Sequence, residues 1–198
     1  MKKIQTSVLP VMACLILGVS TAVASVSITA ESSSYTAELS NGSALPEGFN
    51  FALGSFGAFS PTTANLSSWQ TNWTALATGT WTSFDDFNFS GILSDSNPAP
   101  FTVGGAAFVW GYDSQLATTG SEWILFSNPN WNWPVSPVGP GVPVTWSLAN
   151  SGPTTVIVGT VDNGNSSFQT TAIPEPGTTC LLALAAGSGI FLRLRRRG

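Results

Sequence analysis

The side chains that could do chemistry in this sequence are mostly carboxylates and tryptophans. Between Ser25 and Ile173 the chain has no Lys, Arg, His or Cys. Without His or Cys, this segment has no Ser-His-Asp triad, no thiolate nucleophile and no ordinary zinc site. Without Lys or Arg, it has no Schiff base, no phosphate clamp and no cationic surface for nucleic acid. Nine carboxylates lie in this segment: Glu31, Glu38, Glu47, Asp85, Asp86, Asp95, Asp113, Glu122 and Asp162.

Carboxylates alone leave two kinds of site open. Two Asp or Glu suffice for glycoside hydrolysis, but no spacing in the sequence pairs any two of them. We therefore predict no enzyme activity, with a carboxylate-based glycosidase as the alternative. Asp85-Asp86, Asp95-Ser96-Asn97 and residues 162–165 place oxygen ligands in expected loops, which suits calcium, yet none has the EF-hand or nonapeptide spacing. Turn formation is the commoner use of Asp and Asn, so we predict no cofactor, with calcium as a weak alternative.

Trp131 and Trp133 lie in the stretch Asn128-Pro129-Asn130-Trp131-Asn132-Trp133-Pro134, which is rich in turn formers. Exposed indole faces can stack on sugar rings while neighbouring amides bind hydroxyl groups. Burial against one end of a β-core is the commoner use of Trp. The sequence thus leaves a carbohydrate-binding module that uses exposed Trp131 and Trp133 as an alternative function.

The first 24 residues have the pattern of a secretory signal peptide. Lys2 and Lys3 precede an apolar run over residues 8–19, and Ala22 and Ala24 are the small residues that a signal peptidase reads. We expect cleavage after Ala24. An uncleaved membrane anchor is the alternative, but the apolar run is short and contains Pro10.

The last residues are typical of a short membrane-spanning helix. As a helix, residues 180–192 would rise about 20 Å and residues 177–194 about 27 Å, against a hydrocarbon layer of about 30 Å. The terminal cluster of Arg193, Arg195, Arg196 and Arg197 would remain cytoplasmic by the positive-inside rule and leave the preceding segment on the far side. A buried C-terminal helix with a solvated basic tail is the alternative.

Pro174, Glu175 and Pro176 stand directly before this apolar stretch. Prolines on both sides of one carboxylate favour an extended segment that a helix cannot cross. The order of Pro-Glu-Pro, apolar helix and Arg cluster resembles the bacterial PEP-CTERM sorting signal over about the last 27 residues. The resemblance implies that a membrane-embedded exosortase recognises the triplet, removes the tail and releases the protein or transfers it to the cell surface.

Residues 25–172 remain as one exported domain, whose length suffices for a sizeable core. Alternation marks strands at residues 25–29, 87–89 and 142–148, and continuous β-formers mark strands at 106–112, 122–126 and 154–161. Turns are expected at residues 95–100, 128–140, 150–153 and 162–165. This pattern predicts a mainly β domain, a single antiparallel sandwich or jelly roll. Leu66, Trp69, Trp73 and Leu76 recur at helical spacing and predict one helix over residues 64–77.

These features together predict three parts: a signal peptide (1–24), an exported β-rich domain (25–172) and a sorting signal (173–198). The predicted function is that of a non-enzymatic component of the cell surface or extracellular matrix, in an exopolysaccharide context. Its expected partners are an exosortase-like enzyme, the membrane before processing and polysaccharide, and no nucleic acid.

Overall fold

The computed structural model describes residues 25–32, 34–83, 86–94, 97–134, 143–149 and 154–174. The predicted signal peptide lies outside these ranges, as does the sorting signal after Pro174, including Glu175, Pro176 and the four arginines. Within the described ranges, no helix is long and apolar enough to span a membrane.

The described part of the chain is mainly β, with one short helix, so the predicted fold class is confirmed at that level. The strands are β1 (Ser25–Glu31), β2 (Thr36–Glu38), β3 (Asn50–Ser55), β4 (Thr74–Thr80), β5 (Asn88–Ser94), β6 (Ala106–Tyr112), β7 (Glu122–Asn132), β8 (Val144–Ser147), β9 (Thr155–Val158), β10 (Thr160–Asp162), β11 (Ser167–Gln169) and β12 (Thr171–Ala172). A 3-10 turn, η1 (Leu66–Ser68), leads into α1 (Trp69–Asn72).

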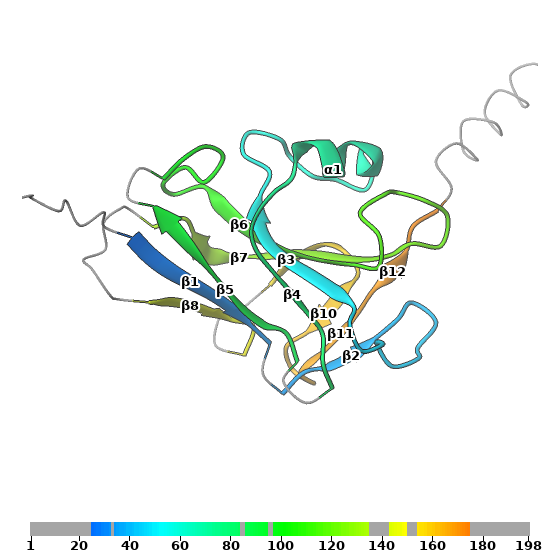
Figure 1. Cartoon of the computed structure of the whole chain (residues 1–198). Coiled ribbons are helices and arrows are strands. Elements are labelled where there is room, and N and C mark those ends of the chain that lie inside the picture. The colour runs from blue at the N-terminus through cyan, green and yellow to red at the C-terminus, as the bar shows by residue number, and fades with distance from the viewer. Residues whose placement is uncertain are drawn as a thin grey trace, which may run out of the picture.

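Three sheets organise these strands (Figure 1). The large sheet has the order β12-β7-β6-β3-β4, and β9 also pairs with β7. Smaller sheets have the orders β5-β1-β8 and β10-β11-β2. The described pairs are antiparallel except β1–β8 and β11–β2, which are parallel. The sequence predicted antiparallel pairing throughout, and these two pairs correct it.

The central strands of the large sheet, β3, β6 and β7, are buried on both faces, and they carry apolar residues at consecutive positions. Neighbouring residues of a strand point to opposite faces. Val109 and Phe126 accordingly belong to the main core, which β1 and β5 also line, whereas Trp110 and Leu125 belong to a second cluster. α1 lies above the large sheet in Figure 1, and its Trp69 is fully buried in that second cluster. The segment from β3 to β4 thus covers the second face.

The predicted helix over residues 64–77 is wrong in extent. Helical structure ends at Asn72, and Trp73 already has an extended backbone with φ −89° and ψ 135°. The four apolar residues do not share one face, since Leu66, Trp69 and Trp73 pack in the second cluster while Leu76 packs against the main core from β4. The Thr-rich sequence of β4 favours a strand, and pairing with β3 stabilises it.

One turn connects β4 to β5, and the two strands belong to different sheets. Two backbone bonds close the turn: the Thr82 N–H donates to the Asp86 carbonyl (3.0 Å), and the Asp86 N–H donates to the Thr82 carbonyl (2.9 Å). Beyond the turn the strands are closely apposed, because a Cβ at Gly79 would lie 2.8 Å from the Phe89 ring and one at Gly91 would lie 2.7 Å from Leu76. The two glycines therefore allow β4 and β5 to lie this close together although they belong to different sheets.

Candidate functional site

Trp131 and Trp133 are buried, each with 1% of its surface exposed. The Trp131 ring stacks on Trp146 with centroids 6.2 Å apart, and Trp133 meets Trp146 and Phe101 edge-on at 5.4 and 4.9 Å. The expected turn over residues 128–140 is also wrong at its start, because β7 continues to Asn132. The two rings complete one end of the core, so stacking of sugars on exposed Trp131 and Trp133 is ruled out in this structure.

Two carboxylates lie at one end of the β6–β7 pair, Asp113 just after β6 and Glu122 at the start of β7. The Glu122 carboxylate accepts hydrogen bonds from the Ser40 N–H, the Ser40 hydroxyl and the Thr170 hydroxyl. Asp113 Oδ1 accepts the N–H groups of Ser114 (2.6 Å) and Glu122 (3.0 Å). Hydroxyl and backbone donors thus surround these acids where many proteins place a Lys or Arg.

The 162–165 segment forms the predicted turn, with its carboxylate turned onto the turn itself. Asp162 Oδ1 accepts the Gly164 N–H (2.9 Å) and the Asn165 N–H (3.2 Å), and Oδ2 accepts the Asn165 side-chain amide (2.7 Å). These bonds lower the pKa of Asp162 below its usual value, the side chain of Asn165 contributing most. No group of three His, Cys, Asp or Glu that could hold a metal ion occurs among the described residues.

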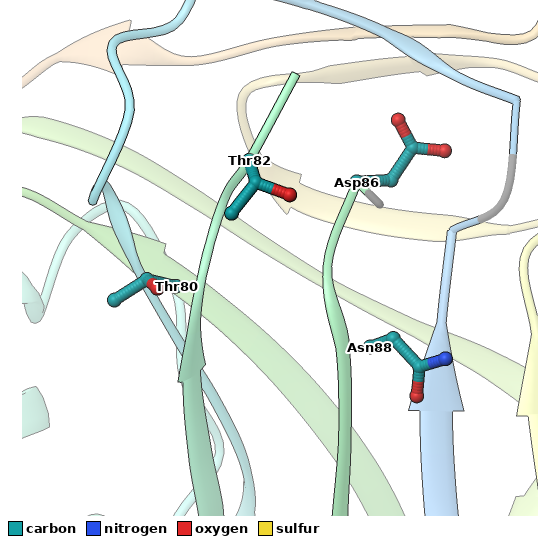
Figure 2. Close-up of a pocket in the computed structure, with 4 residues that line it drawn as sticks. All are labelled: Thr80, Thr82, Asp86 and Asn88. Carbon is teal, nitrogen blue, oxygen red and sulfur yellow. The ribbon is translucent and has the colours of Figure 1, made fainter. Parts of the chain in front are cut away.

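A polar hollow of about 370 Å³ lies beside the turn that connects β4 to β5. Thr80, Thr82, Asp86 and Asn88 line it (Figure 2). The threonines come from the end of β4 and the start of the turn, and the acid and amide come from the end of the turn and the start of β5. Asp86 Oδ2 accepts the Tyr35 N–H at 3.3 Å, which joins the turn to the segment after β1.

The described residues that line the hollow are polar, and they do not form a hydrolytic pair. Asp86 is the one carboxylate among the lining residues, while retaining and inverting glycosidases use two. Asp85 lies outside the described residues. The sequence identified Asp86 only as an oxygen ligand in a loop, and no motif marked Thr80, Thr82 or Asn88.

No known protein family, no curated protein and no solved structure matches this chain.

Proposed function

We propose that this protein is an exported component of the cell surface or extracellular matrix, sorted by a PEP-CTERM-like signal. Its exported part is a single β-sandwich with a structural or adhesive role and no enzymatic activity. The tail holds it transiently in the membrane until an exosortase-like enzyme acts at Pro174-Glu175-Pro176. The observation that carries the proposal is the charge distribution: all six Lys and Arg stand in the two predicted targeting segments.

The part of the chain proposed to be exported has a packed core and no cationic side chain to pair with its acids. Its core is aromatic, and its carboxylates rely on hydroxyl and N–H donors. Ile28 of β1, Phe51 of β3 and Phe126 of β7 share one core cluster, which supports a sandwich with the β5-β1-β8 sheet facing the large sheet.

Fractionation of a chain tagged at residue 198 and inside the domain tests the sorting proposal. We expect the domain tag in the medium or on the surface and loss of the C-terminal tag. Replacement of Arg193, Arg195, Arg196 and Arg197 by Ala should retain or misdirect the full-length form, because the stop-transfer charge is lost. Glu38→Gln, at an exposed position of β2, is the control and should be processed normally.

The proposal fails if full-length protein remains in the membrane and removal of the arginines changes nothing. A Glu175→Ala variant separates recognition from orientation, because it keeps the apolar helix and the Arg cluster. If Glu175→Ala is processed like the parent chain, the triplet is not the recognition element.

A further inference from the structure

Asp86 occupies a backbone position at which glycine has the lowest conformational cost. Its φ is 57°, in the left-handed region, at the last residue of a hairpin turn. Asp tolerates this region better than most residues, but glycine adopts it with no steric penalty. A strained residue that lines a hollow is a reason to look for a binding role there.

The chemistry of the lining favours a neutral ligand rich in hydroxyl groups. A carboxylate accepts several hydroxyl donors, an amide both donates and accepts, and a threonine hydroxyl does the same. The hollow offers all three through Asp86, Asn88, Thr80 and Thr82. Because no cation lies between Ser25 and Ile173, nothing in this segment compensates the charge of a phosphate, sulfate or uronate ligand.

The same chemistry continues from the hollow along β5. Residues two apart lie on one face of a strand, so Ser90 and Ile92 follow Asn88 on the exposed face. Ile92 has 72% of its surface exposed, and Ser27 and Thr29 of β1 stand opposite Ile92 and Ser90. Hydroxyl groups beside one exposed aliphatic side chain match a sugar ring, which has polar edges and an apolar face of C–H groups.

We propose that the hollow and the adjoining face of β5 and β1 bind a segment of neutral polysaccharide. Asp86 and Asn88 hydrogen-bond sugar hydroxyls in the hollow, and Ile92 contacts a ring face farther along β5. The inference deepens the proposed function, since it names the matrix component that an exported adhesive domain would hold. It replaces Trp131 and Trp133 with a surface that the structure leaves open to solvent.

Affinity gel electrophoresis of the protein that cells release tests this surface. Where cells release none, the full-length chain extracted in detergent takes its place, so binding is measured whatever the outcome of sorting. The gels contain dextran, hydroxyethyl cellulose or mannan as neutral probes, and polygalacturonate as the anionic probe. We expect retardation by at least one neutral probe and none by polygalacturonate.

Asp86→Gly is the decisive variant, because glycine suits the turn. It removes the carboxylate and, with it, the bond from the Tyr35 N–H. It should weaken binding by about tenfold or more, the effect of losing a hydrogen bond to a charged group. Asn88→Ala should also weaken binding, and it leaves the turn unchanged. Ser166→Gly is the matched control, since Ser166 also has a left-handed backbone, with φ 49°, and is not among the lining residues of the hollow. Its affinity should equal that of the parent chain.

Four results overturn the inference. The first is that no neutral probe retards the parent chain, and the second is that folded Asp86→Gly and Asn88→Ala bind as the parent chain does. The third is that the parent chain binds polygalacturonate more strongly than the neutral probes. The fourth is that a chelator abolishes binding. The last result would mean that a metal ion makes the contact. Near-UV circular dichroism verifies the fold of each variant. A chain that is sorted normally and binds no probe refutes this inference and leaves the proposed function standing.

Discussion

A single methyl group at Gly54 should destabilise the domain by forcing apart two of its elements. A Cβ at this position would lie 2.3 Å from the Thr74 carbonyl oxygen and 2.6 Å from Cζ2 of Trp73. Real Cβ contacts do not fall below 3.0 Å, so β4 or the indole has to move by several tenths of an ångström. Gly54 also sits at the register shift between β3 and β4, where pairing is already irregular.

The expected size follows from two opposing effects. Replacing Gly by Ala stabilises a compatible site by about 0.4–1 kcal/mol through the unfolded chain. Overpacking of a filled core costs about 1–3 kcal/mol, and here one of the clashing atoms belongs to the backbone. We therefore expect Gly54→Ala to lower the free energy of unfolding by about 2 kcal/mol. For a domain of this size, that loss corresponds to about 4–8 °C in Tm.

Thermal unfolding followed by Trp fluorescence measures the loss. The near-UV circular dichroism of the folded variant should also change, because Trp73 lies 4.8 Å from Phe56 and 5.6 Å from Trp110, ring centre to ring centre. Gly164→Ala is the control. Its Cβ would meet only the exposed Asp162 carboxylate, at 3.2 Å. Its free energy of unfolding should therefore change by no more than about 0.5 kcal/mol, with a correspondingly small shift in Tm. A Gly54→Ala variant as stable as this control would refute the packing argument.

Three further predictions concern polar groups and charge. Asn65→Ala should lower the free energy of unfolding in urea by about 1–3 kcal/mol, because Asn65 Oδ1 accepts the indole N–H of fully buried Trp69 (2.9 Å). The control Asn72→Ala, at an exposed position, should lower it less. Equal losses in the two variants would contradict the reasoning. The lowered pKa of Asp162 means that its contribution to stability is present above the unfolded pKa, near 4, and is lost as pH falls through the lower folded pKa. Asp162→Asn should therefore flatten the dependence of the urea midpoint on pH below about pH 4, and a slope like that of the parent chain would show that this carboxylate is not involved. Raising the NaCl concentration from about 10 to about 150 mM should raise the Tm of the released form, because salt screens the repulsion among its carboxylates. A fall in Tm would instead indicate attractive charge pairs that salt weakens.

Most strands could be predicted from local pattern because tertiary packing agrees with it. The prediction of a strand at residues 106–112 is confirmed by β6, where a continuous apolar run serves a sheet buried on both faces. β7 was predicted to end at residue 126, because Asn128, Pro129 and Asn130 favour turns. Burial of Trp131 and Trp133 outweighs that preference and carries the strand on to Asn132.

The helix prediction failed for a different physical reason. Leu66, Trp69, Trp73 and Leu76 have helical spacing, but periodicity cannot reveal that two cores lie on opposite faces of one sheet. The chain uses the first three residues to cover one face and then passes into β4, which places Leu76 on the other. A single-sequence pattern carries no information about that change of layer.

The hollow could not be predicted, although its four residues lie within nine positions of one another. Its shape depends on the bridge between Thr82 and Asp86, which brings the ends of β4 and β5 together, and on the left-handed backbone at Asp86. Gly79 and Gly91 allow the two strands to lie close together beyond the turn. The sequence shows the two glycines, but it does not show that Phe89 and Leu76 pack against them. No motif links the glycines to Asp86.

The absence of cations between Ser25 and Ile173 connects the fold to the proposed sorting. The nine carboxylates in that segment have no cationic side chain to pair with. The hydrogen bonds described for Glu122, Asp113 and Asp162 therefore come from hydroxyl, amide and backbone donors. Such a domain is repelled by anionic surfaces and gains nothing electrostatically from remaining near them. Under the proposed function, the basic tail carries all the cationic side chains left after signal cleavage. Its removal would therefore release the domain from the membrane and leave neutral hydroxyl contacts as the means of retention in the matrix.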